Sequence, residues 1–226
     1  MTIELPTNAQ TLNDRMAELI RQKIVHGEFT PGQRLSEAAL SENLEISRNT
    51  LREVFRLLTK EGLLKYEPNR GVSVAVPSIA SIIDIYRVRR LIECQALAQA
   101  YPRHPAKKHL RDAVDTALRC REAGDWQGVG TANMEFHMAI VELADSERLN
   151  VMFSHILAEL RLAFGLLNDL EFLHAPYVDM NVKIVELFEA GKLPEAASEL
   201  NEYLVHSERI LLGVYARRIS DAGQLR

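Results

Sequence analysis

Two sets of residues recur at a helical period between Ser47 and Lys60. The apolar set repeats at spacings of three and four and predicts one buried helix face: Leu51, Val54, Phe55 and Leu58. The basic set repeats at every fourth residue and predicts a second face: Arg48, Arg52, Arg56 and Lys60. Ser47 is a favourable N-cap, because its hydroxyl can accept a hydrogen bond from an unpaired amide in the first turn. The stretch therefore predicts a short helix with one apolar and one basic side.

The residues before this helix predict a partner for it. Pro31-Gly32 is a turn signal, Ser36 is a second N-cap candidate, and a short helix follows as far as residue 43. Two short helices joined by about four residues match the layout of a helix-turn-helix, whose second helix enters the major groove of DNA. The alternative is an ordinary surface helix with solvated arginines. Residues 11–26 predict a preceding helix, and residues 1–10 a loose polar arm.

A hairpin is predicted directly after the basic helix. Two short strands over 63–66 and 72–76 flank Pro68-Asn69-Arg70-Gly71, a sequence suited to a turn with positive φ. Beside a basic helix we interpret this hairpin as a wing, whose tip could reach a groove or phosphates. A purely structural hairpin is the alternative.

From Ser78 onward the chain predicts only helices. Short breaks with Pro, Gly or Asp separate six segments, approximately 79–101, 105–123, 125–144, 146–170, 176–190 and 194–218. Helices joined by short turns form an antiparallel bundle with its own core. We therefore expect a mostly α fold, with a winged helix-turn-helix domain over 1–77 and a six-helix antiparallel bundle over 78–226.

The charge distribution agrees with a local nucleic-acid contact. The net charge of −4 argues against a generally basic coat, but residues 48–70 hold six Lys+Arg against three Asp+Glu. The sequence shows no basic-then-apolar signal segment and no run of about 18 apolar residues. We expect a cytoplasmic protein without a membrane partner.

Several short motifs in the first domain resemble the GntR family of bacterial transcription regulators. They occur in the family's order and spacing: Pro31-Gly32-Gln33-Arg34-Leu35-Ser36-Glu37, Ser47-Arg48-Asn49-Thr50-Leu51-Arg52-Glu53, Glu61-Gly62-Leu63 and Asn69-Arg70-Gly71-Val72. The chain departs from the family at Asn49-Thr50, where Thr-Pro is usual. Proline is favoured near a helix start but not required there, so the expected fold is unchanged, while the base preference can differ.

The helical half resembles the FCD domain of the FadR subfamily. The residues that carry this resemblance are Asp84-Ile85-Tyr86-Arg87-Val88-Arg89-Arg90-Leu91-Ile92-Glu93, Asn133-Met134-Glu135-Phe136-His137 and Asn150. Six helices after the wing, rather than seven, are more similar to the VanR-type branch.

The resemblance implies a ligand-responsive regulator, and we expect a repressor. A homodimer would read a palindromic double-stranded DNA operator, and the helical domain would bind a small carboxylate effector that changes operator affinity. Arg48 and Arg52 can donate paired hydrogen bonds to guanine or to phosphate. The full set of expected DNA contacts is Arg34, Ser47, Arg48, Asn49, Thr50, Arg52, Asn69, Arg70 and Gly71.

In many FCD domains one Asp and three His hold a divalent metal. The corresponding positions here are Asn133, His137, Asn181 and Tyr203. Amide oxygens and a neutral phenol are poor ligands for a transition metal, so we expect no cofactor and a metal-free polar pocket. His174 or His206 could face the same pocket and restore a metal site with His137. Without them, His137 is equally well explained as a buried, hydrogen-bonded histidine.

Two arginines complete the expected effector site. Arg89 is the natural partner for the carboxylate of the acid, although it can also pair with Glu93 at i+4. Arg161 lies between two leucines. It either points inward toward the acid or covers the helix surface with its aliphatic stem.

Two other functional classes remain as alternatives. The first is a helical-bundle enzyme, a lyase or hydrolase, but the sequence contains no His-Glu-x-x-His motif, glycine-rich phosphate loop or nucleophile elbow. The second is a protein-interaction module with a non-functional DNA-binding motif, which the wing and the family motifs disfavour. We therefore expect that the protein is not an enzyme.

Overall fold

The computed structural model describes residues 11–101, 103–167 and 169–224, with side chains placed as far as residue 217. The predicted polar arm over residues 1–10 lies outside this part of the chain.

Three short helices make up the helical part of the N-terminal region. They are α1 (Leu12–Val25), α2 (Glu37–Asn43) and α3 (Arg48–Lys60). Each begins at a residue whose side-chain hydroxyl accepts a hydrogen bond from a first-turn amide: Thr11, Ser36 and Ser47. The predicted apolar face of α3 is buried, and it packs against α1 and α2. The predicted helix-turn-helix is therefore confirmed.

The same region contains a three-stranded antiparallel sheet, in the order β1-β3-β2. The predicted hairpin is formed by β2 (Leu64–Glu67) and β3 (Gly71–Val74), with Glu67 opposite Gly71. The third strand, β1 (Arg34–Leu35), was not predicted. It has only two residues and carries no period of its own, because its pairing with β3 is set by the tertiary fold.

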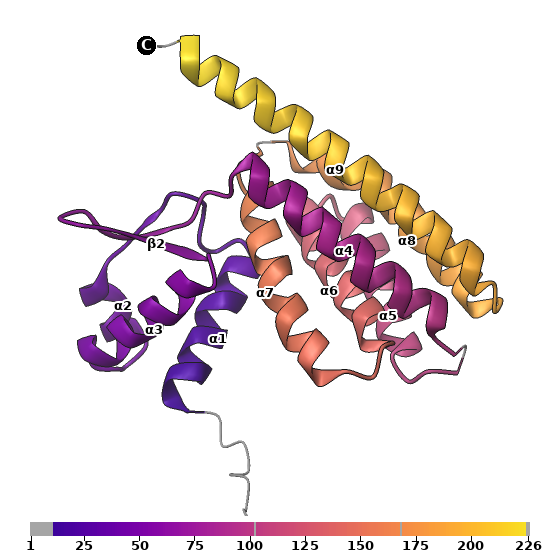
Figure 1. Ribbon diagram of the computed structural model, residues 1–226, viewed down its shortest axis with the longest axis horizontal. Coiled ribbons are helices and arrows are strands. Elements are labelled where there is room, and N and C mark those ends of the chain that lie inside the picture. Colours follow the sequence, from indigo (N-terminus) through magenta and orange to yellow (C-terminus); the bar gives the residue numbers. More distant parts are fainter. Residues whose placement is uncertain (1–10, 102, 168, 225–226) are drawn as a thin grey trace, which may run out of the picture.

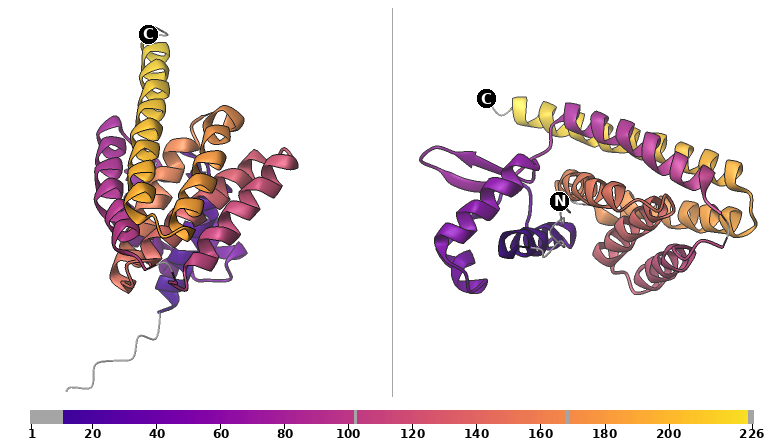
Figure 2. Two further views of the ribbon diagram at one scale, coloured as in Figure 1. Left: turned by 90° about the vertical axis from the view of Figure 1, so that its right-hand side faces the viewer. Right: turned by 60° about the horizontal axis from the view of Figure 1, so that its bottom comes forward.

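Six helices follow the wing in the described part of the chain, as predicted: α4 (Ile79–Gln99), α5 (Lys107–Glu122), α6 (Trp126–Glu142), α7 (Glu147–Phe164), α8 (Leu170–Glu189) and α9 (Leu193–Gln224). In Figure 2, α4 and α9 lie side by side as an outer layer over the other helices of the bundle. In the described part of the chain, no helix combines the length and the apolar character needed to cross a membrane.

Three predicted helix boundaries in the bundle are wrong. The last helix was predicted to end at 218, but α9 continues to Gln224. The predicted start at Pro176 falls inside α8, which begins after Asp169, whose carboxylate accepts a hydrogen bond from the amide of Phe172. A proline there removes one intrahelical bond, and the aspartate cap still favours the earlier start. The predicted helix over 146–170 ends early, at the C-cap Gly165, where Pro31 packs closely against the backbone.

The helix α7 belongs to both halves of the molecule. One hydrophobic core fills the bundle, and a second fills the winged region. The second core includes Ala158 and Leu162 of α7 beside residues of α1 and α3. Figure 1 shows α7 between α1 on one side and the bundle on the other. The winged region is therefore seated directly on a helix of the bundle.

Candidate functional site

The basic face of α3 is exposed, whereas its apolar face is buried. The exposed side chains include Arg48, Asn49 and Arg52, and Thr50 is half-buried. Ser47 has a structural task at the start of this helix, because its hydroxyl accepts a hydrogen bond from the Thr50 amide at 3.0 Å. The N-terminal end of α3 therefore presents donors to solvent from a helix that the protein core holds in place.

The arginines of this surface differ in their ion pairs. Arg52 Nε donates to Glu37 of α2 at 2.9 Å, and Arg56 donates to Glu53 at 2.6 Å. Within the described residues, Arg48 has no ion-pair partner. Exposed pairs such as these contribute little stability. Arg48 and Arg52 thus remain able to exchange solvent or a surface carboxylate for a ligand phosphate or base.

The tip of the wing is a tight turn that extends into solvent. Arg70 N donates to Glu67 O at 3.0 Å, and Asn69 and Gly71 have positive φ of 63° and 82°. Asparagine and glycine adopt this conformation at low cost. Arg70 is exposed, with its guanidinium 3.6 Å from Glu67. Arg34 is exposed on β1, next to the hairpin. The expected DNA contacts therefore lie on three exposed elements of one domain.

Three of the four positions that correspond to metal ligands are joined in one buried hydrogen-bond network. Asn181 Nδ2 donates to Asn133 Oδ1 at 2.7 Å. Tyr203 OH also donates to Asn133 Oδ1, at 3.1 Å, and lies 3.0 Å from Asn133 Nδ2. Burial raises the pKa of Tyr203 well above its ordinary value, so the hydroxyl keeps its proton. The three side chains form a neutral polar cluster in the bundle core.

The fourth position, His137, lies in a buried charged network. Arg89 Nε donates to Glu93 Oε1 at 2.7 Å, and His137 Nδ1 lies 2.5 Å from Glu93 Oε2. Burial would raise the pKa of Glu93, but Arg89 and His137 outweigh it and lower this pKa. Burial lowers the pKa of His137, so the ring is neutral and Nδ1–H donates to the carboxylate. Arg89 and Glu93 therefore balance each other within the network.

These donors do not fit a transition-metal site. Asn181 Nδ2 and Tyr203 OH donate to the oxygen that Asn133 would offer to a metal, and His137 Nδ1 is occupied by Glu93. Among the described residues, no group of three His, Cys, Asp or Glu side chains is placed to hold a metal ion. Three buried atoms of the two networks have no hydrogen-bond partner there: Arg89 Nη2, His137 Nε2 and Asn181 Oδ1. The absence of a metal remains a prediction.

The remaining candidates lie elsewhere. His206 is exposed on α9, with its ring centroid 6.0 Å from that of Tyr177. Arg161 and His174 are both buried, and they meet beside Gly130 of α6. Arg161 therefore points inward, as one of its two predicted orientations requires. Among the described residues, His174 and His137 share no hydrogen bond.

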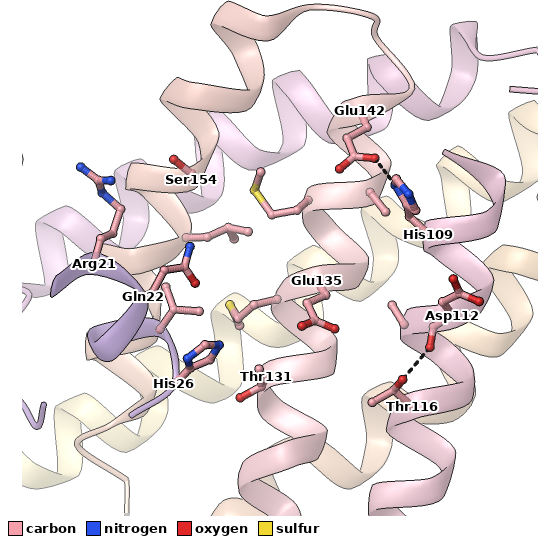
Figure 3. Close-up of a pocket in the computed structure, with 16 residues that line it drawn as sticks. Arg21, Gln22, His26, His109, Asp112, Thr116, Thr131, Glu135, Glu142 and Ser154 are labelled. Carbon is pink, nitrogen blue, oxygen red and sulfur yellow. Dashed lines mark hydrogen bonds and ion pairs between the residues drawn. The ribbon is translucent and has the colours of Figure 1, made fainter. Parts of the chain in front are cut away.

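A cavity of about 390 Å³, not anticipated from the sequence, lies between the winged region and the bundle. Figure 3 shows Gln22 and His26 facing Thr131 and Glu135 of α6 across it. Its two walls come from segments about 100 residues apart, so no local pattern could have indicated it. Beside it, Gln127 Nε2 donates to the His26 carbonyl at 2.6 Å and links the two halves.

The far wall of this cavity is acidic. His109 Nδ1 lies 2.6 Å from Glu142, as the dashed line in Figure 3 indicates. Asp112 and Glu135 add two further carboxylates, and Met134 also lines the cavity. Polar groups of α1 and carboxylates of α5 and α6 therefore line the same open space.

Two family descriptions match successive parts of the chain. Residues 12–74 match "Bacterial regulatory proteins, gntR family", and residues 84–206 match the FCD domain. The first range covers the helix-turn-helix and the wing, and the second covers most of the bundle.

Individual relatives agree with these matches. The chain is 36% identical to a GntR transcriptional regulator from Rhodococcus sp. RHA1 of known crystal structure, with a TM-score of 0.83 over 89% of this chain and 97% of that one. It is 35% identical over 101 residues to the HTH-type transcriptional repressor RspR of Escherichia coli K12, covering 44% of each chain. It is 27% identical over 142 residues to the HTH-type transcriptional regulator YdhC of Bacillus subtilis 168, covering 61% of this chain. The chain thus spans 44% and 62% of the lengths of these two curated relatives.

Proposed function

The chain belongs to the GntR family of bacterial regulatory proteins, with an FCD domain after its winged helix-turn-helix, and we propose that it is a cytoplasmic repressor controlled by a small organic acid. The family and its relatives are transcription regulators, not enzymes. In this proposal a homodimer binds a palindromic operator, and the acid in the helical domain lowers operator affinity. A similar protein, RspR, is named a repressor, which supports the direction of control.

The observation that carries the proposal is the two-sided character of α3. Its four apolar side chains are buried, while Arg48 and Arg52 extend into solvent at the end that a recognition helix directs into the major groove. One such helix contacts too few base pairs for specificity in a genome. A two-fold symmetric pair doubles the length of the recognised site, which is the reason for proposing a dimer and a palindrome.

The seating of the winged region on α7 supports a mechanism of control. An acid that binds one relative placement of the two domains better than another shifts the population toward that placement. The operator-bound dimer requires one spacing between its two recognition helices. A change at the contact of α1 with α7 therefore alters the fit to both half-sites at once. The cavity beside His26 supports the proposal, because it leaves space for this movement.

The acid has several candidate partners in the helical domain, all drawn from the buried polar side chains. The proposed set is Arg89, Asn133, His137, Arg161, Asn181 and Tyr203. One of the two guanidinium groups would bind its carboxylate, because paired N–H groups match the two carboxylate oxygens. The neutral amide, phenol and imidazole groups would bind any hydroxyl or carbonyl on the acid. The site needs no metal in this proposal.

The proposal is tested by selecting bound sequences from random duplex DNA with the full-length protein. We expect enrichment of a two-fold symmetric sequence. Arg48→Ala and Arg52→Ala should each weaken binding to it by about tenfold to a hundredfold, because a paired base contact contributes about 1–3 kcal/mol. Circular dichroism should show unchanged helical content. Replacing the exposed Arg87 of α4 with Ala is the matched control, and it should leave DNA affinity unchanged.

Two results would contradict parts of this proposal. If both α3 variants keep the wild-type sequence preference, α3 is not the recognition helix. If the enriched sequences lack two-fold symmetry and sedimentation shows a monomer on DNA, the dimeric operator is wrong.

A further inference from the structure

Arg161 is a buried cation without a counter-charge in the described part of the chain. Its side chain is 5% exposed, and no carboxylate of the described residues lies within ion-pair distance. Its Nη1 atom is buried and has no hydrogen-bond partner there. Burial lowers the pKa of Arg161, and no neighbouring acid opposes this effect. Burying a charge without a partner costs several kcal/mol, so binding a negatively charged group beside Arg161 would be favourable.

A second polar atom without a partner lies at the same point. His174 Nε2 of α8 is buried and also has no hydrogen-bond partner among the described residues. Gly130 of α6 makes this convergence possible. A Cβ at Gly130 would lie 2.7 Å from His174 Nε2 and closer still to Arg161 Nη1. Any larger residue would push both side chains away. Three helices therefore direct one guanidinium and one imidazole to a single place.

Arg89, which is also buried in the bundle, has the counter-charge that Arg161 lacks. Arg89 has Glu93 one helical turn away, so its charge is already balanced. An incoming carboxylate would compete with Glu93 at Arg89, whereas it would meet no competing carboxylate at Arg161. The electrostatic gain on binding a small acid is therefore larger at Arg161.

We propose that Arg161 and His174, meeting over Gly130, bind the carboxylate group of a small organic acid. This assignment rests on the proposed function, since it places the effector within the same helical domain. The planar guanidinium donates to the carboxylate oxygens, and the imidazole donates through Nε2–H. The ring of Phe164, whose centroid is 5.6 Å from that of His174, lies beside the site and favours a small apolar substituent on the acid.

The position of this site couples it to the winged domain. Arg161 Nη2 lies 3.6 Å from where a Cβ of Gly27 would be, and Gln127 Nε2 lies 3.2 Å from the same point. Gly27 follows His26, the C-cap of α1, and has a φ of 76°, so the chain reverses there. Since α1 packs on α3, an acid that draws Arg161 toward itself changes the support beneath the recognition helix.

The test titrates the full-length protein with sodium acetate at constant ionic strength and follows the His174 ring by NMR. Acetate should cause a saturable shift of the His174 Hε1 resonance. It should also raise the pKa of His174 by about one unit or more, because a nearby anion favours the imidazolium. Arg161→Gln should weaken acetate binding by at least about tenfold, since a charged donor is lost. Replacing the exposed Arg148 of the same helix with Gln is the matched control and should change nothing.

Gly130→Ala separates loss of the site from loss of the fold. Alanine is a better helix former than glycine, so the variant should fold with unchanged helical content. Its methyl group should displace both side chains and weaken acetate binding by a factor similar to that of Arg161→Gln. Wild-type acetate affinity in Gly130→Ala would overturn the assignment.

Further outcomes test the acid site separately from the proposed regulatory function. No acetate-dependent change at His174, or equal affinity in Arg161→Gln, would overturn the proposal. Binding of inorganic phosphate but not acetate would show an anion site of the wrong class. Acid-dependent DNA binding that persists in Arg161→Gln would place the effector elsewhere and leave the regulator intact. A wild-type protein that binds no DNA but shows the His174 shift would overturn the proposed function while supporting this site.

Discussion

Two arginines among the described residues of the helical domain are almost completely buried, and their surroundings are opposite. Arg89 is 1% exposed and Arg161 is 5% exposed. Arg89 is held by Glu93, which also accepts a hydrogen bond from His137. Arg161 meets His174 and a glycine, and the described residues offer it no carboxylate. The first arrangement is electrically balanced, and the second carries an uncompensated positive charge.

The comparison shows that burial alone does not determine whether the charge of an arginine is balanced within the protein. Burial acts to lower the pKa of both guanidinium groups, but at Arg89 the attraction of Glu93, together with contributions from Tyr86 and Tyr203, outweighs it and the pKa is raised. Glu93, one helical turn away, makes the largest contribution against burial at Arg89. Arg89 is therefore expected to hold the bundle together, and Arg161 is expected to respond to what binds.

The strongest test of this contrast removes the carboxylate from the balanced site. Glu93→Gln should lower the free energy of unfolding by about 3–5 kcal/mol, because it leaves Arg89 as a second unpaired buried charge. Chemical denaturation at pH 7 measures the effect. The matched control is Asp112→Asn, which breaks an exposed i,i+4 pair with Lys108 and should cost less than about 0.5 kcal/mol. A loss as small as that of the control would mean that Glu93 does not balance Arg89.

The pH dependence of stability should reveal the unbalanced site. Burial, with a further contribution from Arg161, lowers the pKa of His174 to about 4. The unfolded chain therefore takes up the proton first, at its ordinary pKa of about 6.5. Stability should be fully present above about pH 6.5. It should fall as the pH drops toward about 4, with a slope of up to about 1.4 kcal/mol per pH unit from this group.

The variant His174→Gln isolates this contribution. It should flatten the dependence of unfolding free energy on pH between about 6.5 and 4, leaving the part that belongs to His137 and His155, whose pKa values burial also lowers. An unchanged slope would show that His174 has an ordinary pKa in the folded protein and is not beside an uncompensated cation.

The smallest expected effect comes from removing the unpaired charge itself. Arg161→Met keeps most of the side-chain volume, and in acid-free buffer it should raise the free energy of unfolding by about 1–2 kcal/mol. The same change at Arg89 should instead destabilise the protein, because Glu93 would be left alone. Loss of stability in Arg161→Met would mean that the guanidinium is already balanced in the folded state.

Local patterns predicted much of the fold because the interactions behind them are local. Ser36 and Ser47 were predicted as N-caps from their position before an amphipathic run, and both caps are formed. The positive φ of Asn69 at the hairpin turn is likewise a property of a few adjacent residues. The strand at Arg34–Leu35 was missed, since two residues pair only when the fold delivers a neighbouring strand.

The candidate effector site was predicted only in part, for a related reason. The resemblance to FCD domains indicated Asn133, Asn181 and Tyr203, which are joined in one network. The convergence of Arg161 with His174 depends on the packing of three helices around Gly130, and no spacing in the sequence encodes that packing. The start of α8 was missed because Pro176 suggested a later one; Asp169 caps the helix, and the burial of Leu173 and His174, which depends on tertiary packing, keeps the turn before the proline helical.

The presence of Ala158 and Leu162 in the core of the winged region has a consequence for protein engineering. The small side chain of Ala158 lets α1 approach α7, so the surface of the winged region is complementary to this face of the bundle. In a chimaera of this winged region with the helical domain of another regulator, α1 would pack poorly on the foreign helix unless Ala158 and Leu162 of α7 are transferred as well. Transferring both α7 residues with the winged half should restore a well-packed junction. An exchange of domains in this protein therefore has to include these α7 residues, and a single junction near Ser78 is not sufficient.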